Sequence, residues 1–193
     1  MDAPLQPGDI LFTRGHSFVS RAIRFFTRHA GESRTKVNHV GLVVEGGTLQ
    51  TAVVVEALRE VQRHRIVEQY GGEEHEVSLY RSVRLTPGDM KRVVAKAESY
   101  VGRRYGYGKI ALHALDWALQ GAYVFRRLGR MDDYPICSWL VAQAYGEVGL
   151  HFGCAAGAAS PDDIWDYVTT YPAEFARVQE LVRVPAAAAR AAA

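Results

Sequence analysis

The sequence predicts one domain that mixes β-strands with α-helices, and three observations favour this class. Short apolar runs bounded by turn residues, such as 10–13 and 38–44, are typical of buried strands. Longer segments with apolar residues at helical spacing, such as 137–149, are typical of helices with a buried face. The length of 193 residues is enough for one hydrophobic core.

The predicted elements alternate along the chain. We expect strands at 10–13, 38–44, 51–57, 61–70 and 77–83, and helices at 16–29, 87–100, 110–120, 137–149 and 161–167. Thr86 and Ser160 are expected N-caps, because each is followed by Pro and then by Asp three residues on. We expect the domain to cover residues 1–184, and the Ala-rich tail at 185–193 to be frayed.

Composition and charge argue against several function classes. The hydrophobic share of 48% and the charged share of 23% are ordinary for a globular protein. A net charge of +2 and the lack of a recognisable motif argue against a nucleic-acid partner. No apolar run approaches the roughly 18 residues of a membrane span. Residues 1–7 lack the pattern of a secretory signal, so we expect a cytoplasmic location unless another route exports the protein.

The expected helix at 16–29 has a basic outer face that carries Arg21, Arg24 and Arg28. Such a face is either solvated or in peripheral contact with an anionic membrane surface. The sequence assigns no oligomeric state.

The hairpin at 38–57 brings a histidine and a glutamate together. If the chain reverses between Gly47 and Thr48, His39 lies directly opposite Glu56, with Cβ atoms about 5 Å apart. Moving the centre of the turn by one whole residue keeps both on one face of the sheet, and a half-residue shift separates them. The alternatives are a core histidine at His39 and a solvated edge-strand carboxylate at Glu56.

The two cysteines differ in their surroundings. Cys137 opens an apolar helix, and the free N–H groups and dipole of a helix N-terminus favour the nucleophilic thiolate. The alternative is a small buried core residue. Cys154 lies in a small-residue loop and is expected to be structural. A bridge between the two would consume the nucleophile.

Cys137, His39 and Glu56 together supply the three roles of nucleophilic catalysis. A cysteine nucleophile needs a base that takes its proton and a third group that orients the base. A histidine partner also explains a carboxylate in the apolar strand 51–57, because burying a lone carboxylate is costly.

Three motifs resemble those of the NlpC-type papain-like cysteine peptidases. They are PGDILF at residues 7–12, NHVGLV at 38–43 and CSWLV at 137–141. Ordinary members place the cysteine helix before the histidine strand. Here that order is reversed, which is similar to the circularly permuted, YiiX-like branch. The resemblance covers residues 7–167, nearly the whole chain.

The resemblance implies a papain-like α+β fold, in which an antiparallel sheet packs against the helix that starts at Cys137. It implies Cys137 as nucleophile, His39 as general base and then acid, and Glu56 as the orienting group. It also implies a tyrosine near the oxyanion or the substrate, for which Tyr105 is the best match and Tyr107 the second. Ile136 departs from the family, whose ordinary members commonly carry Asp before the cysteine.

The expected function is therefore that of a cysteine peptidase or amidase that cleaves an amide through a thioester, on a peptide or a peptidoglycan fragment. A lipid ester or thioester is the alternative substrate, because the permuted branch also resembles the lecithin retinol acyltransferase group. A catalytically silent binding module is the third hypothesis. We expect no cofactor and no metal, because the other histidines lack metal-ligand spacing with Cys or Asp.

Overall fold

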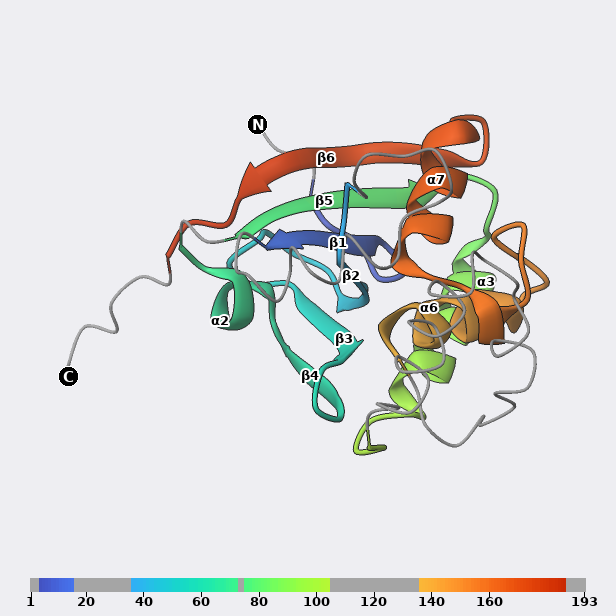
Figure 1. Ribbon diagram of the computed structural model, residues 1–193, viewed down its shortest axis with the longest axis horizontal. Coiled ribbons are helices and arrows are strands. Elements are labelled where there is room, and N and C mark those ends of the chain that lie inside the picture. Colours follow the sequence, from blue (N-terminus) through green and yellow to red (C-terminus); the bar gives the residue numbers. More distant parts are fainter. Residues whose placement is uncertain (1–3, 16–35, 73–74, 105–135, 187–193) are drawn as a thin grey trace, which may run out of the picture.

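The computed structural model describes residues 4–15, 36–72, 75–104 and 136–186 (Figure 1). These residues form a six-stranded sheet in the order β4-β3-β2-β1-β5-β6, with every neighbouring pair antiparallel. The strands are β1 (Ile10–Gly15), β2 (His39–Glu45), β3 (Val53–Ala57), β4 (Val61–Arg65), β5 (His75–Ser82) and β6 (Phe175–Arg183). The helices are α2 (Ile66–Tyr70), α3 (Pro87–Glu98), α6 (Cys137–Gly146), α7 (Pro161–Thr170) and the 3-10 turn η1 (Ala156–Ala158).

Two hydrophobic clusters cover the two faces of the sheet. On one face, alternate strand residues such as Phe12, Val40 and Leu42 pack against α3, α6 and α7. On the other face, the intervening residues such as Leu11 and Val43 pack against α2. The period-two alternation of the strands separates these sets. The mixed fold with an antiparallel sheet is therefore the one predicted.

Several predicted boundaries are confirmed. Thr86 and Ser160 cap α3 and α7, and each hydroxyl accepts the N–H of the Asp three residues later. The capping aspartate in turn accepts the N–H of the cap residue, so each box satisfies two backbone donors at the helix start. Helix α6 starts at Cys137 as expected and ends at Gly146, three residues early.

One predicted strand is wrong, and one observed strand was not predicted. Residues 61–70 do not form one strand, because the chain turns into α2 after Arg65. The Glu68 carboxylate accepts the Arg65 N–H and fixes this start, and Ile66, Val67 and Tyr70 then point into the second hydrophobic cluster. The sequence also gave no indication of β6. Register shifts against β5 accompany an irregular burial pattern in β6, whose buried residues Phe175 and Gln179 are four residues apart.

The PGD motif has a structural role. Asp9 is fully buried, and both of its carboxylate oxygens accept hydrogen bonds from the Arg81 guanidinium, at 2.7 and 2.8 Å. Gly8 has a φ of +92°, in the left-handed region that favours glycine, and a Cβ there would also lie 2.3 Å from the Met90 sulfur. The buried Tyr145 hydroxyl donates to the Gly8 carbonyl at 2.6 Å. The motif thereby anchors α6 to the start of β1.

The predicted helices at 16–29 and 110–120 lie outside the described residues, as does the tail after residue 186. In the part of the chain that the structure describes, no helix is long and apolar enough to cross a membrane.

Candidate active site

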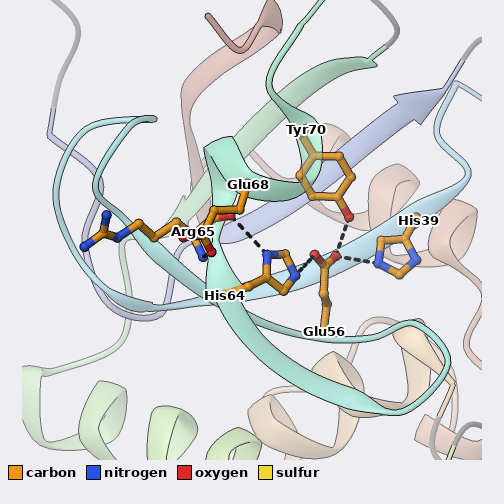
Figure 2. Close-up of polar contacts among 6 residues, drawn as sticks. All are labelled: His39, Glu56, His64, Arg65, Glu68 and Tyr70. Carbon is orange, nitrogen blue, oxygen red and sulfur yellow. Dashed lines mark hydrogen bonds and ion pairs between the residues drawn. The ribbon is translucent and has the colours of Figure 1, made fainter. Parts of the chain in front are cut away.

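His39 and Glu56 are in contact on neighbouring strands. The His39 Nε2 lies 2.5 Å from the Glu56 Oε2 (Figure 2). In the pairs Leu42–Val55 and Val43–Val54 each residue lies opposite a residue two positions from the predicted one, and a register shift between Val43 and Glu45 separates these pairs from Glu45–Val53 beside the turn. Direct opposition of His39 and Glu56 is therefore wrong, but the two-residue difference keeps both on one face, and they meet diagonally.

Gly41 makes room for this contact. Continuing the register places Gly41 across from Glu56, and a Cβ at Gly41 would lie 3.1 Å from the Glu56 Cβ and 3.2 Å from its Oε2. Those separations are tighter than ordinary van der Waals contact. The glycine of the NHVGLV motif thus leaves space for the glutamate side chain.

Glu56 has two further partners that sequence reasoning missed. The Tyr70 hydroxyl donates to Oε2 at 2.6 Å, and the His64 Nε2 lies 2.6 Å from Oε1 (Figure 2). The β3–β4 register could have identified His64, because Glu56 pairs with Gln62 and the alternate residue His64 therefore shares the face of Glu56. The sequence does not indicate the Tyr70 contact, because it predicts a strand over residues 61–70 where Tyr70 lies on α2.

Glu56 is a buried carboxylate that stays charged. Its side chain is 0% exposed, and burial by itself raises the pKa of a carboxyl group. The charge and hydrogen bond of His39, with the charge of His64, outweigh burial and lower the pKa of Glu56 to about 2. The solvated edge-strand alternative is therefore wrong: β3 is an inner strand, flanked by β2 and β4.

Cys137 occupies the first position of α6, and it is 6% exposed. The extended residue before it, Ile136, has an apolar side chain, so no side-chain cap from Ile136 occupies the first N–H groups of the helix. Backbone N–H groups of Val40 and Ser138 donate to the sulfur. These donors favour the thiolate.

Cys137 and His39 form an electrostatic pair. Burial raises the pKa of the Cys137 thiol, but the charge and hydrogen bond of His39 outweigh it and lower the pKa below its usual value. Burial likewise lowers the pKa of His39, and the charges and hydrogen bonds of Cys137 and Glu56 reverse this and raise it. Both directions favour a thiolate beside an imidazolium.

Ser138 holds the start of α6 in place. Its fully buried hydroxyl donates to the Ala159 carbonyl at 2.6 Å, which ties the helix N-terminus to the loop that follows η1. Cys154, in the loop before η1, is half-buried, and no disulfide joins it to Cys137. Tyr105 and Tyr107, predicted near the substrate or oxyanion, lie outside the described residues.

The chain resembles known proteins over nearly its whole length. A family model described as the permuted papain-like amidase enzyme, YaeF/YiiX, C92 family, matches residues 4–184. A crystal structure described as the metalloprotein YiiX from Escherichia coli O157:H7 is similar, with a TM-score of 0.51 and 18% identity. That similarity covers 94% of this chain and 89% of that chain, and it supports the fold. No curated protein matches the chain.

The description as a metalloprotein applies to the YiiX structure and not to this chain. Within residues 4–15, 36–72, 75–104 and 136–186 of this chain, no group of three or more His, Cys, Asp or Glu side chains is arranged to hold a metal ion.

Proposed function

This chain belongs to the permuted papain-like amidase family, and we propose that it is a cysteine hydrolase in which Cys137 attacks the carbonyl carbon of an amide. The observation that supports the proposal most is the position of Cys137 at a helix N-terminus, paired with His39, whose other side contacts Glu56. Each of the three roles of nucleophilic catalysis then has a residue.

In the acylation step, the Cys137 sulfur forms a bond to the carbonyl carbon and the carbonyl π electrons move to the oxygen. His39 gives its proton to the amide nitrogen as the C–N bond breaks, and the amine leaves. The product is a thioester between Cys137 and the acyl group. The Cys137 backbone N–H is the proposed donor to the oxyanion, because an N–H in the first turn of a helix has no partner within the helix.

In the deacylation step, the now neutral His39 removes a proton from water, and the water oxygen attacks the thioester carbon. The C–S bond breaks, and the carboxylic acid product leaves. The proton held by His39 restores the starting thiolate–imidazolium pair. Glu56 keeps the imidazole oriented in both steps, because its Oε2 holds Nε2 and leaves Nδ1 for the sulfur.

We propose an amide in a short cell-wall peptide, such as the bond after a γ-glutamyl residue, as the first substrate class. The amidase description of the family supports an amide over other acyl bonds. Carboxylic esters and thioesters follow the same two steps with a better leaving group, so they belong in the same screen.

The test is a hydrolysis assay with γ-glutamyl peptides, acyl esters and acyl thioesters, comparing wild type with Cys137→Ala and Cys154→Ala. We expect turnover in wild type and in Cys154→Ala, and a loss of at least 10³-fold in Cys137→Ala. Turnover that survives Cys137→Ala would contradict the proposal. A folded wild-type protein that hydrolyses none of the substrates and also fails to form an acyl-enzyme would support a binding module instead.

A further inference from the structure

Two histidines contact the two oxygens of one buried carboxylate. His39 meets Oε2 of Glu56 at 2.5 Å, and His64 meets Oε1 at 2.6 Å from the opposite side (Figure 2). Oε1 and the His64 Nε2 are both buried, and neither forms a well-aligned hydrogen bond with any group of the described chain. Each of these two atoms therefore depends on the ion-pair contact between them.

The contacts of the two ring nitrogens of His64 indicate which of them carry protons. Nδ1 lies 3.0 Å from the Arg65 carbonyl oxygen, which only accepts hydrogen bonds, so Nδ1 carries a proton. Nε2 faces a carboxylate oxygen, which also only accepts, so Nε2 carries a proton as well. A neutral His64 would direct a lone pair at either the carbonyl or the carboxylate. Both ring nitrogens of His64 thus face acceptors, an arrangement that fits an imidazolium.

We propose that His64 is a positioning residue for the proposed acyl transfer: as an imidazolium it holds the second oxygen of Glu56 and offsets its charge, and so sets the acidity of His39. The inference rests on the proposed function for its catalytic meaning. Without the positive charge of His64, the negative charge of Glu56 would act undiminished on His39 and make it a weaker acid. His39 must release its proton to the leaving group, so its acidity matters for turnover.

The other groups that face His64 agree with this charge state. The Glu68 carboxylate on α2 acts on His64 with the same sign as Glu56, and the pKa of His64 is raised although burial opposes it. The Tyr70 ring lies 6.4 Å from the His64 ring, centroid to centroid, and its hydroxyl is committed to the other oxygen of Glu56. The His64 side chain is 13% exposed, so it exchanges protons with solvent.

The first measurement is nitrogen-15 NMR of the histidine rings in the wild-type protein, titrated from pH 5 to 10. We expect both ring nitrogens of His64 to be protonated at pH 7, and the pKa of His64 to lie above the ordinary value of about 6.5. A neutral His64 at pH 7 would overturn the proposal without any variant.

The second measurement follows the titration of His39 in His64→Gln, which keeps a donor for Oε1 but removes the charge. We expect the pKa of His39 to rise by about one unit, as for loss of a nearby positive charge. His64→Lys restores a charge, and we expect it to bring the His39 pKa back toward wild type. The matched control is His75→Gln. It removes a histidine ring that packs edge-on against the Tyr70 ring, with 5.5 Å between the ring centroids, and it should leave the pKa of His39 unchanged.

An unchanged or lowered His39 pKa in His64→Gln, or a failure of His64→Lys to rescue it, would overturn the inference. These titrations need no substrate, so the two proposals fail separately. Hydrolysis by wild type with no His39 shift would contradict only the role of His64. A His39 shift in a protein that hydrolyses no substrate would contradict only the proposed function.

Discussion

Glu56 is the residue on which the geometry of the proposed site depends most. It is fully buried and meets three side chains, from β2, β4 and α2. A buried carboxylate with several donors is held in one orientation, because losing any donor leaves a buried lone pair unsatisfied. The site therefore tolerates little movement of this side chain.

Gly41→Ala tests this tolerance. The added methyl group would lie 3.1 Å from the Glu56 Cβ, and Glu56 cannot withdraw without breaking its contacts with His39 and Tyr70. We expect the free energy of unfolding to fall by about 1–3 kcal/mol, as for overpacking in a core. We also expect the alkylation rate of Cys137 at pH 6 to drop at least tenfold.

The matched control is Gly157→Ala in η1, where an added Cβ meets nothing within 4 Å. For this variant, urea unfolding should show a change of less than about 0.5 kcal/mol in the free energy of unfolding. Equal stability and reactivity in Gly41→Ala and Gly157→Ala would show that Glu56 is free to move.

At the scale of elements, the turn between β2 and β3 and the start of α6 position the reactive groups. The pairing differs from the predicted one by two residues, and a register shift lies between Val43 and Glu45, but His39 and Glu56 still share one face of the sheet. Helix α6 is held by Ser138 at its N-terminus and by Tyr145 near its C-terminus. Both anchors are buried hydrogen bonds to backbone carbonyls.

Ser138→Ala is expected to destabilise the protein by about 1–3 kcal/mol, because it leaves the Ala159 carbonyl without its buried donor. The control is Ser99→Ala, which removes a hydroxyl that donates to the Lys96 carbonyl at an exposed helix end. For Ser99→Ala we expect the free energy of unfolding, measured with urea, to fall by less than about 0.5 kcal/mol. Equal losses in the two variants would mean that the Ser138 contact does not hold α6.

How far the sequence predicted these elements depends on how local their signals are. The start of α6, the caps at Thr86 and Ser160 and the β2–β3 hairpin follow from residues close in sequence, and all were predicted. Strand β6 exists only through its pairing with β5, with shifts in register, so its own sequence lacks a clear period. The Tyr70 contact depends on α2, a five-residue helix whose apolar residues also suit a strand.

The residues of the candidate site were also predictable only where their signals are local in the sequence. Cys137, His39 and Glu56 were identified from the motifs and the hairpin, and their contacts agree with that choice, while their catalytic roles remain proposals. His64 and Tyr70 were not identified, because their approach to Glu56 depends on the β4–α2 turn. A charge network assembled from three separate elements has no local signature.

At the scale of the whole molecule, buried charges link stability to pH. The pKa of Glu56 is lowered in the folded protein. Its contribution to the free energy of unfolding is therefore fully present at a pH above the pKa of about 4.5 that the group has in the unfolded chain. That contribution is lost as the pH falls toward about 2. The pKa of His39 is raised, so its contribution is fully present below about 6.5 and is lost as the pH rises through its folded value.

We therefore expect the free energy of unfolding to fall on the acid side by on the order of 3 kcal/mol through Glu56 alone. Urea unfolding of wild type and Glu56→Gln between pH 2 and 10 measures this contribution. The variant should be less stable at pH 7, and the difference between the two proteins should shrink as the pH falls from about 4.5 toward 2. A difference that stays constant across that range would show that Glu56 is not ionised in the folded state.

The most direct test of the central claim is the pH dependence of iodoacetamide alkylation at Cys137, resolved by mass spectrometry, in wild type and His39→Ala. Cys154 in the same chain is the internal control. The thiolate–imidazolium pair predicts a fast rate at Cys137 well below the free-thiol pKa of about 8.5, and a collapse of that rate in His39→Ala. A rate at Cys137 that follows an ordinary thiol and ignores His39 would contradict the account.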